Sequence, residues 1–510
     1  MTLDWIASLA LTAYIVVLTL VCLYSGHRGF LVSLFYRVRS KRPVPPGKFA
    51  ELPPATVQLP MYNEQYVAQR VIEQACRIDY PRDRLEIQVL DDSTDQTQEI
   101  ARQTVERMRA AGHNVVYLHR SQRKGFKAGA LEEGLRQARG EFIAIFDADF
   151  LPPAEILRET IHYFTDDRVG MVQTRWAHLN REQSVLTQTQ AVLLDGHFVI
   201  EHTARNRTGR FMSFNGTGGI WRKAAIIDAG GWQHDTLTED LDLSYRAQLR
   251  GWKFVFLPEL TSPAELPPEM NAFKAQQHRW TKGGAQTCVK LLPRVLRSKL
   301  SWWVKLEAFF HLTSSAVYIL IVLLSLLIGP ALYAKLIVGG QDPPWRLAWE
   351  MVLFFVGFGA PLAFYILSQR ALRRSWYKSL KYVPALMAIG IGIAFNNAIA
   401  ALEGFFGRTG EFVRTPKLGD QARPSADWRK RLGGLHHRKS WQTWAELGMA
   451  FYLTACLVGF FFFDRWYERV SAAMPFLMLF IVGYFYVALH SLYTEWHARR
   501  LVKVSSSQSL

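Results

Sequence analysis

Short apolar runs alternate with amphipathic stretches between Leu52 and Ala308. The apolar runs predict buried strands at 55–60, 86–90, 115–118 and 142–146. The stretches between them predict helices at 64–77, 96–111 and 128–139. Strands that alternate with helices indicate a mainly parallel sheet, and the ligands of such sheets bind beyond the carboxyl ends of the strands. We therefore predict an α/β domain with its site along one edge of the sheet.

The flanks of this region carry apolar stretches long enough to cross a bilayer. They cover 5–24, 309–333, 347–367, 382–402, 444–463 and 473–492. The first stretch is expected to remain as an anchor, because Met1 to Asp4 contains no basic residue and no clear cleavage site follows. The sequence thus predicts a multi-pass membrane protein.

The net charge of +17 is concentrated in basic residues beside the apolar stretches. We therefore expect a lipid bilayer as a partner, and no nucleic acid. Arg28, Arg37, Arg39, Lys41 and Arg42 follow the first stretch, so the positive-inside rule predicts that the α/β domain is cytoplasmic. Under this interpretation the protein lies in the plasma (inner) membrane.

The stretch 382–402 has basic loops on both sides, and a segment that crosses once cannot have both ends on one side. Gly390, Gly392, Asn396 and Asn397 suit a helix packed against protein rather than lipid. We predict that this stretch is interfacial or re-entrant, which leaves five spans, with six as the alternative. The four cysteines show no paired spacing, so neither a disulfide framework nor a zinc site is expected.

Candidate chemistry centres on Asp147 and Asp149, which follow the apolar run 142–146. Alternate residues of a strand share a face, so both carboxylates are expected to point the same way. A divalent cation that carries phosphate oxygens would neutralise them, which indicates a nucleoside-diphosphate site. An isolated Asp-x-Asp is more often an ordinary solvated turn, so this interpretation depends on the other motifs.

Two further acidic clusters have a structural and a chemical interpretation. Asp91 and Asp92 at the end of the second strand could cap the next helix or bind a nucleobase or ribose. Glu239 and Asp240 begin a helix that should end near Arg250, and Asp240 could act as a general base. A helix N-terminus lowers a carboxylate pKa, so desolvation would have to outweigh this effect.

The remaining clusters are basic, glycine-rich or aromatic. Arg123, Lys124 and Lys127 follow the third strand and could meet a diphosphate or form a solvated face. The glycine-rich run 214–222 would allow the backbone to approach a sugar chain. In a helix, Gln276, Arg279 and Trp280 would share one face, where Arg could bind diphosphate and Trp could stack on a pyranose. The same pentapeptide could instead anchor a membrane-interface helix.

Four motifs occur in order on an α/β domain that is followed by membrane spans: Asp-Asp, Asp-Ala-Asp, Thr-Glu-Asp and Gln-x-x-Arg-Trp. This series resembles the processive family 2 glycosyltransferases. These include the cellulose, curdlan, hyaluronan and chitin synthases. The local sequences at 58–64, 91–95 and 276–280 are similar to those of the cellulose-synthase-like proteins that make mannan or glucan backbones. The resemblance implies a GT-A-like cytosolic domain at 49–300, an N-terminal helix and basic linker at 1–48, and an α-helical transmembrane channel region at 301–510.

The resemblance also implies roles for individual residues. Asp240, with Glu239, would be catalytic, and Asp147 and Asp149 would hold Mg²⁺ or Mn²⁺. The donor would be bound by Asp92, Asp147, Asp149, Lys127, Gln276, Arg279, Thr415 and Lys417. The acceptor would be bound by Trp280, Asn215, Gly216 and Thr217. The stretch 412–417 resembles the gating loop (about 408–420) that follows an interfacial helix (about 381–406), although Arg414 stands where the family has a small or apolar residue.

These features predict an inverting, processive enzyme that extends a β-linked hexose polysaccharide and passes it through its own membrane helices. The expected donor is UDP-glucose first and GDP-mannose second, with the growing polysaccharide as acceptor. No cyclic-dinucleotide-binding domain is expected. One alternative is a non-processive enzyme that makes a glycolipid, as ceramide glucosyltransferase does. Another is a transporter with a regulatory nucleotide domain, although the spans contain few ionisable residues.

Overall fold

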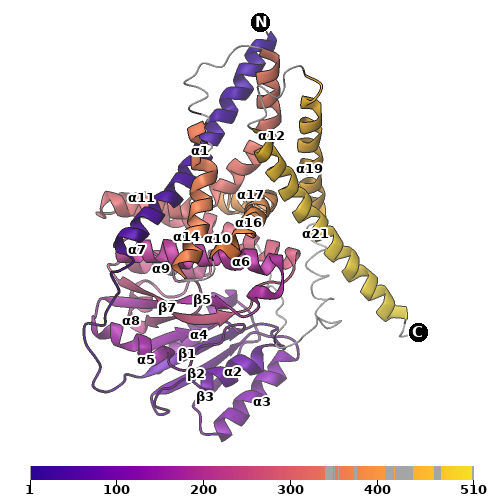
Figure 1. Cartoon of the computed structure of the whole chain (residues 1–510). Helices are drawn as coiled ribbons and strands as arrows, with labels where there is room; N and C mark the ends of the chain where they lie inside the picture. The colour runs from indigo at the N-terminus through magenta and orange to yellow at the C-terminus, as the bar shows by residue number, and fades with distance from the viewer. Residues whose placement is uncertain are drawn as a thin grey trace.

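The computed structural model describes residues 2–338, 349, 351–353, 355–372, 376–407, 419, 440–463 and 473–507. Its lower part is an α/β domain built on a seven-stranded sheet, and its upper part is a group of long helices (Figure 1). The strands are β1 (Ala55–Met61), β2 (Leu85–Asp91), β3 (Val115–His119), β4 (Phe142–Ile145), β5 (Val169–His178), β6 (Gly219–Arg222) and β7 (Lys253–Ala264).

The strand order is β3-β2-β1-β4-β6-β5-β7. Only β6 runs antiparallel to its neighbours, β4 and β5, so the predicted mainly parallel sheet is confirmed. Every residue of β1 and β2 is buried, as expected for parallel strands with both faces covered. Alternate residues of β4 enter two different cores: Phe142 and Ala144 pack on one face, Ile143 and Ile145 on the other.

The helices of the α/β domain cover both faces of this sheet. They are α2 (Ala68–Cys76), α3 (Thr97–Ala110), α4 (Phe126–Gln137), α5 (Ile156–Thr160), η1 (Ile161–Thr165), η2 (Arg181–Gln183), α6 (Val185–Gly196), η3 (His197–His202), α7 (Thr203–Arg207), α8 (Lys223–Asp228), α9 (Glu239–Leu249) and α10 (Met270–Arg297). The helix predicted at 64–77 begins four residues late, because Asn63 has a positive φ of 55° and turns the chain first.

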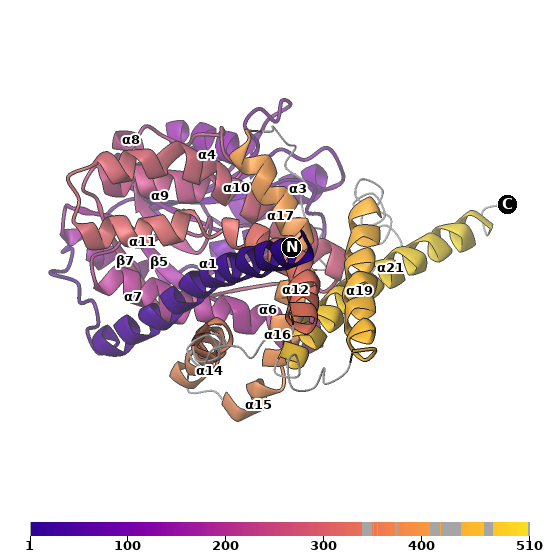
Figure 2. The ribbon, with the colours of Figure 1, turned by 90° about the horizontal axis from the view of Figure 1, so that it is seen from above.

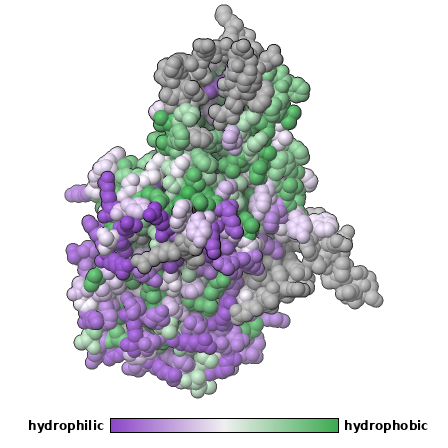
Figure 3. Space-filling view, in the orientation of Figure 1, coloured by the Kyte–Doolittle hydropathy of each residue, from purple (hydrophilic) through white to green (hydrophobic). Residues whose placement is uncertain are grey.

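The upper part contains the apolar helices. They are α1 (Thr2–Val38), α11 (Trp302–Leu312), α12 (Ala316–Val338), η4 (Phe355–Gly359), α14 (Ala360–Ala371), α15 (Trp376–Leu380), α16 (Val383–Gly392), α17 (Ala394–Phe405), α19 (Ser440–Phe460) and α21 (Met474–Ser507). Seen from above, α1 lies along α12, while α14 and α19 stand on opposite sides of α12 (Figure 2). The surface of this part is hydrophobic, in contrast to the polar surface of the α/β domain (Figure 3).

Within the described residues, five helices are long and apolar enough to cross a membrane: Trp5–Val38, Ala316–Leu336, Met351–Ala371, Trp441–Phe460 and Met474–Trp496. A further pair, Trp376–Gly392 and Ala394–Phe405, is bent by 47°. The count is therefore five spans, or six if the bent pair crosses the membrane as one span, and these are the two numbers predicted from the sequence. The span predicted to begin at 309 begins at Ala316, because α11 ends at Leu312 as a separate helix.

Helix α10 joins the two parts of the molecule (Figure 1). Lys274 of α10 forms a 2.7 Å ion pair with Glu446 of α19, and Lys282 forms a 2.9 Å ion pair with Glu403 of α17. Both lysines are buried. Since a buried charge is costly without its partner, these pairs fix the position of α10 against the membrane helices.

Candidate active site

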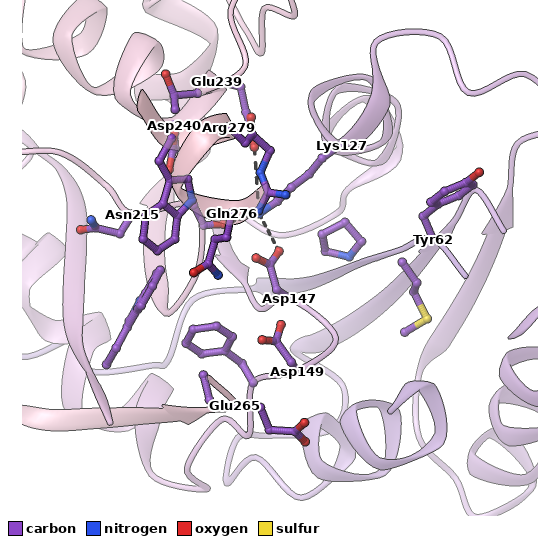
Figure 4. Close-up of a pocket in the computed structure, with 18 of the residues that line it drawn as sticks. Tyr62, Lys127, Asp147, Asp149, Asn215, Glu239, Asp240, Glu265, Gln276 and Arg279 are labelled. Atoms are coloured by element: carbon purple, nitrogen blue, oxygen red, sulfur yellow. Dashed lines mark hydrogen bonds and ion pairs between the residues drawn. The ribbon is translucent and has the colours of Figure 1, made fainter. Parts of the chain in front are cut away.

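A cleft opens between the carboxyl ends of the parallel strands and helices α9 and α10 (Figure 4). Eleven of the predicted site residues line it: Asp92, Lys127, Asp147, Asp149, Asn215, Gly216, Glu239, Asp240, Gln276, Arg279 and Trp280. These residues lie far apart in the sequence and come from helices α4, α9 and α10 and from loops at the ends of the strands. The structure thus brings the ordered motifs into one site.

Asp147 and Asp149 face this cleft together (Figure 4). Strand β4 ends at Ile145, and a turn follows in which the Phe150 N–H donates to the Asp147 carbonyl at 2.9 Å. The Asp147 N–H donates to the Thr217 hydroxyl at 2.9 Å. The shared direction of the two carboxylates therefore comes from a turn held by Thr217, and not from strand alternation as we predicted.

The donor set of this pair fits a divalent cation that also binds phosphate. The described residues contain no group of three or more His, Cys, Asp or Glu side chains that could hold a metal alone. Two carboxylates in an open cleft leave coordination positions for the oxygen atoms of a nucleotide, which Mg²⁺ and related hard ions prefer. Asp147 also forms a 2.5 Å ion pair with Lys127, so part of its charge is already balanced.

Asp240 lies at the N-terminus of α9, opposite the carboxylate pair (Figure 4). Burial, followed by the nearby Glu239 carboxylate, raises the pKa of Asp240 to about 7. Burial also raises the pKa of Glu239. Desolvation thus outweighs the helix N-terminus, which is the condition that a general base at this position requires.

Lys127 connects the two acidic groups. Its amino group lies 2.5 Å from Asp147 and 4.0 Å from Glu239, and it donates to the Gly216 carbonyl at 2.8 Å. Burial alone would lower the pKa of Lys127, but Asp147 and Glu239 outweigh it and raise the pKa. Lys127 is therefore a charged group at the centre of the cleft.

The two neighbouring acids after β2 have separate tasks. Asp91 accepts hydrogen bonds from the Ser93 N–H at 2.9 Å and from the Tyr117 hydroxyl at 2.6 Å, which is a structural role. Asp92 lines the cleft and is held at both oxygens by Arg120, at 2.7 and 2.5 Å. The helix-capping task that we considered for this pair is performed by Asp95, which accepts from the Thr97 N–H at 2.9 Å.

Helix α10 presents Gln276, Arg279 and Trp280 to the cleft, as the predicted helical face requires. The Trp280 ring lies 6.5 Å from the ring of Trp176, which also lines the cleft. Since Trp280 points into the cleft, its position favours the sugar-stacking interpretation over a membrane-interface anchor. The opposite side of α10 carries the ion pairs to α17 and α19.

The chain resembles known proteins in both sequence and fold. Residues 53–283 match the model of the family described as Glycosyltransferase like family 2. Glucomannan 4-beta-mannosyltransferase 1 from Oryza sativa subsp. japonica is 33% identical over 85% of this chain and 83% of that protein. Glucomannan 4-beta-mannosyltransferase 2 from Arabidopsis thaliana is 34% identical over 88% of this chain and 86% of that protein. The chain belongs to glycosyltransferase family 2.

A solved structure shows the same fold as this glycosyltransferase. The mannosyltransferase PcManGT from Pyrobaculum calidifontis, in complex with GDP-Man and Mn²⁺, has a TM-score of 0.50 and 20% identity. The match covers 80% of this chain and 100% of that chain. Together with the membrane helices, these comparisons confirm the predicted GT-A-like fold and identify a membrane-embedded, nucleotide-sugar-dependent hexosyltransferase.

Three predicted site residues of the glycosyltransferase are not among the residues that line the cleft. Thr217 lies behind it, where its hydroxyl accepts from the Asp147 N–H and its carbonyl accepts from the side chains of Gln173 and Trp176. Thr415 and Lys417 lie outside the described residues, as does nearly all of the predicted gating loop. Gly419, the described residue at its end, donates its N–H to the cleft residue Glu265 at 3.2 Å.

Several residues that line the cleft were not predicted. Trp176 and His178 come from the end of β5, Glu265 follows β7, and Tyr62 follows β1. The guanidinium of Arg123 lies over the Tyr62 ring at 3.5 Å from its centre. The only sequence signal for Tyr62 was its place directly after the first strand.

Proposed function

We propose that this glycosyltransferase extends a β-linked mannan or glucomannan from GDP-mannose by an inverting, processive reaction. The observation that carries the proposal is the placement of Asp240, with its pKa raised to about 7, in the same cleft as Asp147 and Asp149. A base that ionises near neutral pH and a carboxylate pair suited to a metal-bound diphosphate are the two halves of an inverting transfer site.

For the donor, we place GDP-mannose ahead of UDP-glucose and so reverse the order predicted from the sequence. The relatives that support this order are named as mannosyltransferases and are 33 to 34% identical across most of both chains. The nucleoside would lie near Asp92 and Tyr62, and the diphosphate near Lys127 and Arg279. The growing polysaccharide would be the acceptor, with Trp280 and Trp176 providing apolar faces for its sugar rings.

The reaction is a single displacement at the anomeric carbon. Asp240 removes the proton of the acceptor hydroxyl, whose oxygen forms a bond to the anomeric carbon while the bond to the diphosphate oxygen breaks. Attack from the opposite face inverts the configuration. Lys127 and Arg279 hold the negative charge of the nucleoside diphosphate as it leaves. Mg²⁺ or Mn²⁺, held by Asp147 and Asp149, would supply further charge stabilisation when bound.

The membrane helices and the predicted gating loop complete the proposal. Five candidate spans beside α10 would give the polymer a route across the bilayer. The gating role of 408–420 stays a prediction, because only Gly419 of this loop belongs to the described residues. The basic residues after the first span support a cytoplasmic position of the catalytic domain. Location in the plasma (inner) membrane stays a prediction, which fractionation of cells that express the protein would test.

The test uses the purified full chain in nanodiscs with Mg²⁺ or Mn²⁺. Radiolabelled GDP-mannose and UDP-glucose are supplied separately, and nucleotide release and product length are measured. We expect release from GDP-mannose and a long product that a β-mannanase degrades. Asp240→Asn should abolish the product, whereas Asp228→Asn, at the distant end of α8, should not. A single sugar added to lipid would establish the glycolipid alternative, and no turnover of either donor would overturn the proposal.

A further inference from the structure

A chain of buried and half-buried polar side chains runs from the cleft to the first membrane helix. It begins at Asn215 in the cleft, passes through His197, His202 and Glu201 of η3 and Arg205 of α7, and ends at Glu307 of α11 and His27 of α1. We call these seven residues the Asn215 network. None of the catalytic steps described above uses the network beyond Asn215 itself.

The cleft end of the network fixes the orientation of the Asn215 amide. The Asn215 Oδ1 atom accepts from His202 Nε2 at 2.5 Å, and the Asn215 Nδ2 atom donates to His197 Nε2 at 3.0 Å. Burial and the neighbouring His197 hold the pKa of His202 well below its usual range, so His202 is neutral. With each side of the amide bound to a different histidine, reversing it would break both hydrogen bonds.

The middle of the network fixes the tautomer of His197. Since His197 Nε2 accepts from Asn215, its Nδ1 carries the proton and donates to Glu201 at 3.0 Å. Burial alone would raise the pKa of Glu201, but Arg205 and His197 hold it well below its usual range. His197 and Glu201 lie on η3, a π-helical segment, and such segments are frequent at functional sites.

The far end of the network attaches this segment to the membrane helices. Arg205 donates from Nε to Glu307 at 2.9 Å, and the other oxygen of Glu307 lies 3.0 Å from His27 Nε2. The side chains of Arg205 and Glu307 are 4% and 2% exposed. A firm anchor alone would not require this arrangement, because apolar residues of similar volume stabilise a buried contact as well or better.

We propose that the Asn215 network is a positioning device for the acceptor, which holds one amide face toward the sugar and links that face to α1. After its bonds to the histidines, the Asn215 amide retains one N–H and one lone pair, which match a sugar hydroxyl that donates and accepts. Asn215 also directly precedes Gly216, on which an added methyl group would lie 3.0 Å from Asp240 Oδ2. A hydroxyl bound by Asn215 is thus held beside the base. The inference rests on the proposed function.

The test measures how donor turnover divides between transfer and hydrolysis. The full chain in nanodiscs receives GDP-mannose and a manno-oligosaccharide primer, and released nucleotide is compared with sugar incorporated. His202→Leu should lower the ratio of incorporation to release about tenfold, the effect of one lost hydrogen bond to a reacting group, with the KM for GDP-mannose unchanged. His202→Gln, whose amide N–H replaces Nε2–H, should restore most of the ratio.

His162→Phe is the matched control, because His162 of η1 is also partly buried and hydrogen-bonded, accepting from the Phe49 N–H at 3.2 Å, but belongs to neither the network nor the cleft. It should leave the ratio unchanged at a comparable loss of thermal stability. Glu307→Gln should lower the ratio in the same direction as His202→Leu, and an unchanged ratio would overturn the link to α1. Equal ratios for His202→Leu and the wild type, with normal nucleotide release, would overturn the positioning role. Absence of release in the wild type would instead overturn the proposed function, and this inference with it.

Discussion

Gly216 lies against the carboxylate of Asp240, so that a methyl group on Gly216 would sit 3.0 Å from Asp240 Oδ2. The same methyl group would lie 3.4 Å from the amino group of Lys127. Gly216 also has a positive φ of 80°, a conformation that costs other residues energy. Asp240, the proposed base, and Lys127 therefore both lie beside the backbone of a residue that has no side chain.

Gly216→Ala is expected to lower the transfer rate at least about tenfold, because a shift of the base away from the acceptor is costly in an oriented site. Gly209→Ala is the matched control, since Gly209 has a similar φ of 70° but nothing among the described residues lies within 4 Å of its added methyl group. Both variants should lose about 1 kcal/mol of stability. Equal transfer rates for the two variants would contradict the prediction.

The transfer rate should rise with pH through about 7, because Asp240 accepts a proton only when ionised and its pKa is raised to about 7. Above pH 7, Asp240→Asn should lower the rate about 10²- to 10⁴-fold, and the rate of the variant should not rise with pH. Rate against pH for the wild type, measured with saturating donor, checks the first statement. A rate that is level between pH 5.5 and 8.5, two values about 1.5 units either side of the expected midpoint, would contradict it.

The same shift has a consequence for stability. The folded pKa of Asp240 lies above its ordinary value of 3.8, so the folded state binds the proton more tightly than the unfolded state does. The stability that this residue contributes is therefore lost as pH rises from about 4 to about 7. Asp240→Asn should raise the melting temperature at pH 8 and have little effect at pH 4. The opposite order would contradict the assigned pKa.

Removal of divalent metal should abolish transfer, because two carboxylates and a diphosphate repel one another without it. Chelation followed by readdition of Mn²⁺ or Mg²⁺ should restore the rate. Asp149→Asn should raise the metal concentration needed for half-maximal rate about tenfold or more, since one anionic ligand is lost. Full activity after chelation would contradict the assignment of Asp147 and Asp149 as ligands.

Arg120→Met should raise the KM for the donor and destabilise the fold by about 3 kcal/mol, because it leaves the buried Asp92 carboxylate without its bidentate partner. Arg102→Met is the control. Arg102 forms a 2.7 Å pair with Glu99 in which both side chains are more than half exposed, and such pairs contribute little. Thermal unfolding and donor titration of the two variants check the prediction, which fails if both behave alike.

The ion pair between Lys274 and Glu446 should show strong coupling. Lys274→Met and Glu446→Leu should each cost about 3 to 5 kcal/mol, because each leaves a buried charge unpaired. The double variant should be about as stable as the wild type. Thermal stability in one detergent measures the cycle, and additive losses in the double variant would contradict it.

The site motifs could be predicted from the sequence because each is recognised by the order and spacing of its residues. The helical spacing of Gln276, Arg279 and Trp280 correctly placed all three on one face. The shared direction of Asp147 and Asp149 was correct, but its cause was not, because the turn after β4 is held by Thr217, a loop residue 70 positions away. Arg120 could not be predicted as the partner of Asp92, since their contact crosses from β2 to the end of β3.

The sheet topology could likewise be predicted from the sequence only in part. Buried runs such as β1 and β2 predicted parallel strands directly. The short strand β6 lies within the glycine-rich run 214–222, and its antiparallel insertion between β4 and β5 depends on pairing that the local pattern does not encode. Trp176 and His178 likewise reach the cleft because β5, paired with β7, continues past the short strand β6.

The polar contacts between the two parts of the molecule affect how the enzyme can be produced. Arg205, Lys274 and Lys282 bury their charges against carboxylates that belong to segments after residue 300. A fragment that stops there would lose the carboxylate partners of Lys274 and Lys282 and one of the two carboxylates beside Arg205. We therefore expect soluble expression of residues 49–300 to yield aggregates rather than an active fragment.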